Sequence, residues 1–326
     1  MKDRLAYIDL AKGFAIILIV FRHVVTNNAF LVGFDDYIRL KDITSKFDIS
    51  LFFFLAGVTF GISFFHHKDV INFRSFVFKK IIRIIPAYFT LSVIIYCGSL
   101  ILDCNNLSSI DATVNHFPFY NYLLRPEKVY GQFLWFLYVL VLFYIFTSVF
   151  IRLKNYSDLI LIIFSLFMFI ISLFGVTDLL AANKFCKYFA VFAFGFFCYK
   201  YKSFFLHYLD THRFLLIVLF VLLLPFFENM HWLIVSLVSI PAIICLSRLR
   251  IFKNEQILTR LGYYSFSIYI FHMFVTTSII HIIIFIDLNI DYYFIYVGIS
   301  ILLSLIIPYC LKKKILVHSV TLDRYF

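Results

Sequence analysis

Long hydrophobic runs recur along the whole chain, separated by short polar stretches that hold most of the charged residues. A membrane-crossing helix needs about 20 consecutive, mostly apolar residues. The pattern predicts ten such helices, at roughly 6–25, 47–66, 82–102, 131–151, 158–176, 185–200, 214–228, 231–247, 263–286 and 292–311. The hairpin joining the seventh and eighth runs is short, and a re-entrant loop is the alternative there. The expected fold class is an all-α integral membrane protein, a bundle of about ten transmembrane helices.

The distribution of lysine and arginine predicts the orientation of this bundle, because these residues favour cytoplasmic loops. With the N-terminus inside, 21 of the 29 Lys and Arg residues fall on the cytoplasmic side and 8 on the outer side. An odd number of spans would break this alternation. Both termini are therefore expected in the cytoplasm.

Composition agrees with the pattern and excludes several other classes of protein. The chain is 63% hydrophobic and 14% charged, with a mean hydropathy of +0.95, well outside the range of soluble domains. The only long polar stretch is 103–130, so residues 1–326 are expected to form one transmembrane domain with no appended soluble domain. The net charge of +11 is scattered among loops, which favours a lipid bilayer over nucleic acid as the partner. Six cysteines without paired spacing predict neither disulfides nor a metal site.

The first hydrophobic run carries ionisable residues at both ends. Lys12 and His23 are eleven residues apart, which on a helix places them on one face, about 16 Å apart along the axis. Asp9 lies on the same side, three residues before Lys12, and can pair with it. Such residues within a span usually face a bundle interior or a water-filled cavity. The alternative is interfacial anchoring, in which long side chains reach the headgroups, and this is the expectation for Arg22.

A second candidate group is basic. Lys79, Lys80 and Arg83 lie at the predicted inner end of the third helix, where Lys80 and Arg83 can present two cations on one face. Phosphate groups favour such a pair, and arginine binds them in a bidentate manner. Anchoring at the cytoplasmic surface explains the same cluster equally simply.

Three residues of the ninth run, Ser265, Tyr269 and His272, are spaced so that they share one helix face. They can line a substrate pocket within the bundle. Alternatively, His272 is a neutral histidine that hydrogen-bonds a neighbouring helix.

Three further residues are candidates for a pocket near the outer surface. Asp48 begins the second helix near the predicted level of His23, where it can orient that imidazole or cap its own helix. Trp135 and Tyr138 begin the fourth helix at the outer level. An aromatic belt is the ordinary role of such residues, and a platform for a sugar ring is the alternative.

Five segments, taken in order, resemble one known family: "IDLAKGFAIILIVFRHV", "FDISLFFFLAGVTFG", "KKIIRIIPAYF", "FLWFLYVLVLFY" and "YSFSIYIFH". They resemble membrane acyltransferase family 3, in its fucose 4-O-acetylase-like branch. The first helix of that family carries a basic residue, ten further residues and a histidine, which correspond to Lys12 and His23. The chain departs from the family at Arg22, where many relatives have glycine. It departs again in the second helix, where Asp48, Ser50 and Ala56 replace frequent His, Pro and Ser residues.

The resemblance implies an O-acyltransferase of the bacterial cytoplasmic (inner) membrane. The implied donor is cytoplasmic acetyl-CoA, with its phosphates held by Lys80 and Arg83, beside Lys79. The implied acceptor is a hydroxyl of a cell-surface polysaccharide or lipid-linked glycan. His23 would act as general base, or would itself carry the acyl group, while Lys12, tuned by Asp9, would stabilise negative charge or position the donor.

A transporter or flippase of a lipid-linked sugar is the rival interpretation, because a polar stripe inside a helical bundle also suits a solute path. The sequence shows no internal repeat of the kind that many transporters carry, which counts against it. The acceptor sugar, the acyl group (acetyl or succinyl) and the oligomeric state stay open at this point.

Overall fold

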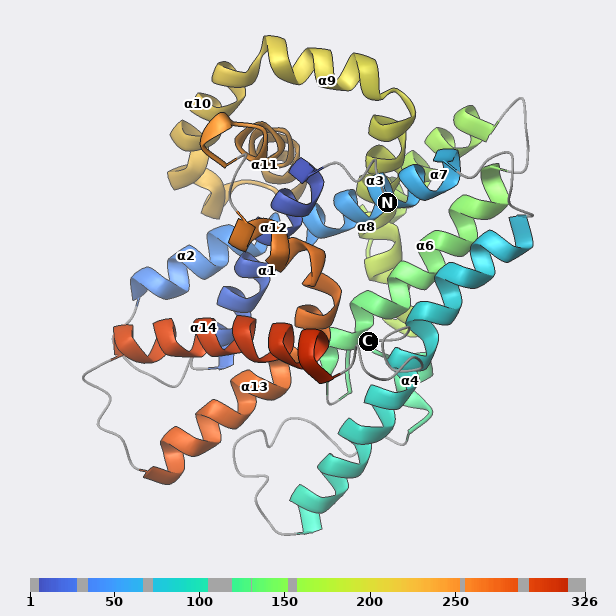
Figure 1. Cartoon of the computed structure of the whole chain (residues 1–326). Helices are drawn as coiled ribbons and strands as arrows, with labels where there is room; N and C mark the ends of the chain where they lie inside the picture. The colour runs from blue at the N-terminus through green and yellow to red at the C-terminus, as the bar shows by residue number, and fades with distance from the viewer. Residues whose placement is uncertain are drawn as a thin grey trace. The chain divides into compact units, whose positions relative to one another are not determined.

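The computed structural model describes residues 6–27, 35–66, 73–104, 119–129, 131–151, 157–252, 256–286 and 293–315. Within these ranges every regular element is a helix, and no strand is present (Figure 1). The chain forms two compact units. Unit 1 combines Met1–Ala56 with Tyr201–Arg324, and unit 2 is Gly57–Lys200. Helix α3 (Asp48–His66) contributes its first part to unit 1 and the remainder to unit 2.

Unit 1 is organised around its first helix. Besides the beginning of α3, its helices are α1 (Ala6–Asn27), α2 (Asp35–Ser45), α9 (Lys202–Thr211), α10 (Arg213–Leu223), α11 (Trp232–Ser247), α12 (Gln256–Tyr263), α13 (Ser265–Ile286) and α14 (Tyr293–Cys310). Helix α1 packs against α2, α11, α12, α13 and α14. Side chains on several faces of α1 are therefore enclosed by protein, including ionisable ones.

Two glycines allow α12 to approach α1 at backbone distance. A Cβ added to Gly262 would lie 1.6 Å from the carbonyl oxygen of Asp9, and one added to Gly13 would lie 2.3 Å from that of Leu258. Neither position can hold a larger residue without a backbone shift. The first half of α1 is thus fixed against α12.

Helix α2 holds the connection between α10 and α11. Arg39 forms an ion pair with Glu228 at 3.1 Å, and Lys46 Nζ donates to the carbonyl oxygen of Met230 at 2.9 Å. Ser236 of α11 donates to the carbonyl oxygen of Lys46 at 3.3 Å. These contacts give Glu228, for which the sequence indicated no role, a structural one.

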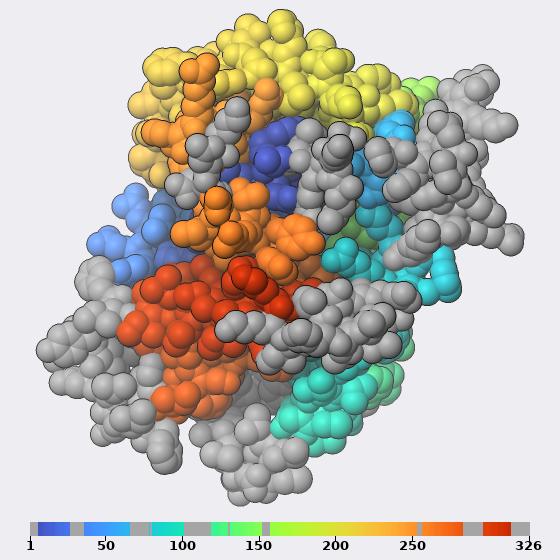
Figure 2. Space-filling view, viewed as in Figure 1, coloured from blue at the N-terminus to red at the C-terminus, as the bar shows by residue number. Residues whose placement is uncertain are grey.

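The chain bends sharply at His212, just before the predicted seventh run. Helix α9 and the segment Arg213–Asn229, which includes the short helix η5 (Leu224–Asn229), form a pair bent by 70°, either a broken span or a re-entrant loop. Figure 2 shows α9 and α10, in yellow, at the surface of the visible face. Exposed phenylalanines on them, Phe204 and Phe214, are suited to contact with lipid.

Unit 2 has an aromatic core that accounts for many of the 45 phenylalanines of the chain. Its helices, besides the end of α3, are α4 (Phe73–Cys104), α5 (Asn121–Leu124), α6 (Trp135–Ile151), α7 (Ser157–Leu173) and α8 (Ala182–Lys200). Helix α6 packs against α4, α7 and α8. Phe143 of α6 meets Phe192 and Phe189 of α8, with ring centroids 5.2 and 5.5 Å apart. Such edge and tilted pairs add to the energy of apolar burial.

Each of the ten predicted ranges is helical over most of its described residues. Among the described residues, six helices are long and apolar enough to cross a membrane, or seven if the bent pair is one span. Two further apolar helices, α7 and α11, are shorter, and α1 carries the charged residues Asp9, Lys12 and Arg22. Helices α2, α9 and α12 lie between or beside the predicted spans and were not expected.

Candidate active site

His23 lies close to the end of α1, beside a second histidine. The ring of His272 on α13 is 5.1 Å from the ring of His23, measured between centroids, and the two planes are inclined by 53°. His272 is completely buried, whereas His23 is half-buried. The packing of α1 on α13 thus brings together two imidazoles that are far apart in the sequence.

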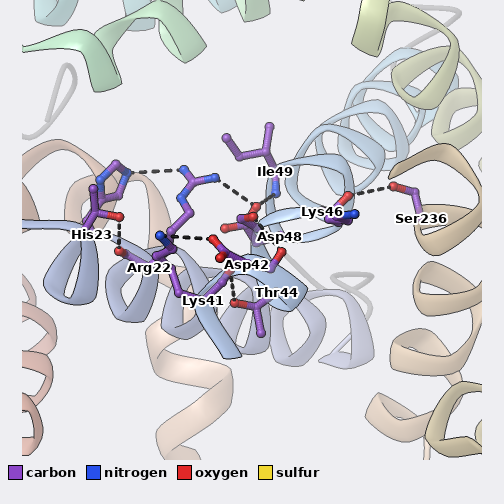
Figure 3. A network of polar contacts seen from close by, with 11 residues as sticks. Arg22, His23, Lys41, Asp42, Thr44, Lys46, Asp48, Ile49 and Ser236 are labelled. Carbon is purple, nitrogen blue, oxygen red and sulfur yellow. Dashed lines mark hydrogen bonds and ion pairs between the residues drawn. The ribbon is translucent and has the colours of Figure 1, made fainter. Parts of the chain in front are cut away.

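A buried ion pair lies next to His23 (Figure 3). Arg22 Nη1 is 3.2 Å from Asp48 Oδ1, and the Asp48 side chain has no exposed surface. The same guanidinium reaches His23, with Nη2 at 3.4 Å from Nε2. The expectation that Arg22 anchors at the headgroups is therefore wrong, since its guanidinium turns inward to a carboxylate of the next membrane helix.

Asp48 combines two roles at the start of α3. Its Oδ1 accepts a hydrogen bond from the backbone N–H of Ile49 at 2.5 Å and also accepts from Arg22. Among the described residues, its contact is with Arg22 and not with His23. The direct orienting contact considered for Asp48 is thus replaced by one that passes through the guanidinium.

The backbone of α13 orients His272. Its Nδ1 lies 2.7 Å from the carbonyl oxygen of Tyr269 and 3.2 Å from that of Ile268, so Nδ1 carries the hydrogen in this contact. Tyr269 and Ser265 are buried on the same helix, and Tyr269 stacks on Phe52 of α3 at 6.0 Å. The three residues singled out on this helix all lie inside unit 1. In the described part of the chain, no group of three His, Cys, Asp or Glu residues could hold a metal ion.

The other end of α1 carries Asp9, which is buried, and Lys12, which is half-buried. Helix α1 runs without a break from Ala6 to Asn27, so Lys12 and His23 stay about 16 Å apart along its axis. The structure does not bring these two groups into one contact, and any joint role requires a ligand that extends along the helix.

The basic group of unit 2 lies on α4. Lys80 Nζ donates to the Ser63 hydroxyl of α3 at 2.9 Å and lies over the Tyr144 ring of α6, 5.8 Å from its centroid. Arg83, one turn further along α4, is exposed. The side chain of Lys79 lies outside the described residues.

The two aromatic candidates of α6 sit in different surroundings. Trp135 stacks on Tyr188 of α8 at 6.0 Å with an interplanar angle of 20°, and Lys184 lies over the Trp135 ring. Tyr138 meets Tyr88 of α4 at 5.9 Å. Residues 105–118, which form much of the polar stretch at 103–130, lie outside the described residues.

Arg22 is the functional candidate that sequence reasoning assigned to another role. Successive residues on a helix point about 100° apart, so Arg22 and His23 were not expected to act together. The Arg22 side chain is long enough for its guanidinium to reach the His23 ring despite this difference in direction. The signal that could have found it is the lone acid Asp48, at the predicted level of His23 on the next membrane helix.

Comparison with known families agrees with this arrangement. A family profile described as an acyltransferase domain matches residues 5–308, which is nearly the whole chain. No curated protein matches the sequence, and no solved structure matches it. The matched range contains all the site residues considered above, together with the apolar helices able to cross a bilayer. The chain therefore belongs to membrane acyltransferase family 3 and is a multi-pass membrane acyltransferase.

Proposed function

We propose that this acyltransferase moves an acetyl group from cytoplasmic acetyl-CoA to a hydroxyl of a cell-envelope sugar or polysaccharide. The observation that carries the proposal is the half-buried His23, enclosed by the Arg22–Asp48 ion pair and the His272 ring within an acyltransferase domain. Acyl transfer to an alcohol needs a general base, and imidazole is suited to that role near neutral pH.

In the proposed reaction, the acceptor hydroxyl gives its proton to His23 as its oxygen attacks the thioester carbonyl. The tetrahedral intermediate then collapses, the carbon–sulfur bond breaks, and the thiolate of CoA leaves. The proton held by His23 returns to that thiolate, so the enzyme ends in its starting form. Lys12 and the buried Asp9 stabilise or position the donor further along α1.

The donor phosphates are assigned to Lys80 and Arg83 of α4. Arg83 is exposed, and a guanidinium binds phosphate through two parallel hydrogen bonds. Lys80 is held in place by Ser63, which limits its freedom before the ligand arrives. Lys79 adds a third positive charge on this turn.

The acceptor side is assigned to the aromatic group at the start of α6. Trp135, stacked on Tyr188, offers a rigid flat surface of the kind on which sugar rings rest. Tyr138 of the same helix belongs to this group. Ser265, Tyr269 and His272 of α13 form a separate candidate set in unit 1. The partner is a cell-surface polysaccharide or a lipid-linked glycan.

The membrane topology belongs to the same proposal. Ten spans with both termini in the cytoplasm place most Lys and Arg residues inside, as the positive-inside rule requires. The bacterial cytoplasmic membrane gives access to acetyl-CoA on one side and to envelope glycans on the other.

The test is the ester content of the host's surface polysaccharide, measured by NMR. Three strains are compared, with the gene intact, deleted, and carrying His23→Ala at a matched protein level. The proposal expects O-acetyl signals in the first strain only. Esters that persist while the amount of surface glycan falls would overturn it in favour of transport, because a flippase moves substrate without His23.

A further inference from the structure

The contact between Arg22 and His23 determines which nitrogen of the imidazole carries hydrogen. A guanidinium has five donors and no acceptor, so Arg22 Nη2 must donate and His23 Nε2 must accept. In the neutral ring the hydrogen is then on Nδ1. A general base needs a free lone pair, which in this tautomer is on Nε2. Here that lone pair faces the Arg22 guanidinium.

That contact is weak by its length. The donor–acceptor distance of 3.4 Å exceeds the usual range of about 2.7–3.2 Å for strong N–H hydrogen bonds. Once His23 takes a proton at Nε2, both its nitrogens are donors and the contact cannot persist. Arg22 must therefore move whenever His23 acts as a base.

Asp48 has a second carboxylate oxygen that can accept a hydrogen bond from the Arg22 guanidinium. Its Oδ1 already accepts from Ile49 and from Arg22 Nη1. Its Oδ2 is buried and, among the described residues, has no hydrogen-bond partner. A buried carboxylate oxygen without a donor is costly, and the planar guanidinium fits a carboxylate through two parallel hydrogen bonds.

We propose that Arg22 is a positioning residue that alternates between His23 and Asp48. At rest, Nη2 covers Nε2 of His23 and holds the imidazole in one tautomer and orientation. When the acceptor hydroxyl arrives, it takes the place of Nη2 at the lone pair, and Nη2 moves to Asp48 Oδ2. The guanidinium is then neutralised by both carboxylate oxygens at the moment when positive charge forms on His23.

This inference rests on the proposed function for its role in turnover, but the contact itself can be tested without any acceptor. Diethyl pyrocarbonate reacts with an unprotonated imidazole nitrogen, so its rate at His23 reports how accessible the lone pair is. The protein is held in lipid nanodiscs at constant pH, and labelling of the His23 peptide is followed by mass spectrometry. Among the described residues, the titratable groups that contact the His23 ring are Arg22 and His272, and they are unchanged unless substituted.

Two variants give opposite expected results. The double variant Arg22→Met with Asp48→Asn removes both charges together, so no lone buried charge is left, and Asn can still accept from Ile49. Its His23 should be labelled about 10-fold faster than in the unaltered protein. The single variant Asp48→Asn keeps Arg22 but weakens its alternative place, so His23 should be labelled several-fold more slowly and turnover should fall.

The matched control is Arg39→Gln, which breaks an exposed ion pair in the same unit and should leave labelling unchanged. If the ion pair is only structural, both variants should loosen the packing around His23. His23 would then be labelled faster in both. Faster labelling in Asp48→Asn, or equal rates in all proteins, would overturn the inference. If the unaltered protein transfers no acetyl group while the labelling pattern holds, the proposed function fails and the positioning contact does not.

Discussion

The cluster around His23 and the basic pair on α4 differ in how their positive charges are buried and compensated. In unit 1, the Arg22 side chain is 18% exposed and its guanidinium contacts the carboxylate of Asp48, whose side chain has no exposed surface. In unit 2, Lys80 contacts a hydroxyl and an aromatic ring, and Arg83 is exposed. A charge compensated inside protein is expensive to bury and suits chemistry at a fixed place, whereas an exposed cation can recruit a mobile anion. We propose that the first region carries out the reaction and that the second binds the donor.

The largest expected effect on stability comes from disturbing the packing of α12 on α1, which supports the first region. Gly262→Ala places a Cβ at 1.6 Å from the carbonyl oxygen of Asp9, which forces α12 away from α1. Overpacking of a core costs about 1–3 kcal/mol and occasionally more, and a backbone clash belongs at the upper end. We expect a loss of roughly 3 kcal/mol in the free energy of unfolding, seen as reduced thermal stability in nanodiscs.

Gly298→Ala on α14 is the matched control, because a Cβ there meets nothing within 4 Å. Equal thermal stability of the two variants would show that the close approach of α12 to α1 does not support the site.

The second region is tested by Arg83→Gln. Loss of a charge-assisted hydrogen bond costs about 1.5–3 kcal/mol, so KM for acetyl-CoA should rise roughly 10–100-fold while kcat changes little. Steady-state kinetics of the reconstituted enzyme measures both constants. The control is Arg260→Gln, an exposed arginine of α12 that bonds Gln256. The same KM in both variants would remove the α4 group from donor binding.

A smaller effect is expected at the ring that packs beside His23. His272→Asn removes an aromatic contact with centroids 5.1 Å apart, and such contacts contribute about 0.5–1.5 kcal/mol. We expect kcat to fall roughly 3–10-fold with KM for acetyl-CoA unchanged, because only the position of the imidazole is disturbed. His281→Asn, an exposed histidine on the same helix, should behave like the unaltered enzyme. A change in KM alone would place His272 in binding instead.

The smallest effect is expected at an exposed ion pair of unit 2. Lys128 donates to Asp178 at 2.6 Å and lowers the pKa of that carboxyl below its usual value near 3.9. The resulting stabilisation is complete above about pH 4 and is lost as the pH falls through the lowered pKa. For a pair this exposed it amounts to at most about 1 kcal/mol. Asp178→Asn should therefore shift the melting temperature slightly at pH 6, and the difference should shrink in nanodisc melting curves as the pH falls below about 4. A larger or pH-independent shift would contradict this assignment.

Much of the fold follows from hydrophobic patterning, since each predicted range is helical over most of its described residues. The pattern did not predict α2 or α12, because both are short and polar and are stabilised by packing on α1 instead of by an apolar run. The position of α12 depends on Gly262, whose lack of a side chain allows close contact with the α1 backbone. Such a tertiary contact is not visible in the hydrophobic pattern.

The candidate site was also only partly predictable, because some of its contacts depend on tertiary packing. His23 was visible as an imidazole within a hydrophobic run at a fixed distance from Lys12. The sequence placed Asp48 at the level of His23, but not the Arg22 guanidinium that lies between them. The contact with His272 arises from the packing of α1 on α13. Arg22 was assigned to the headgroups because no sequence rule links it to an acid 26 residues away.

The most direct test of the central role of His23 uses the purified enzyme in lipid vesicles with radiolabelled acetyl-CoA and an extract of envelope glycans. His23→Gln is compared with the unaltered protein for acetyl-CoA affinity and for label transferred to glycan. The account predicts unchanged affinity with turnover reduced by roughly 10²–10⁴-fold, the usual contribution of a general base. Label transferred by His23→Gln at the unaltered rate would contradict it.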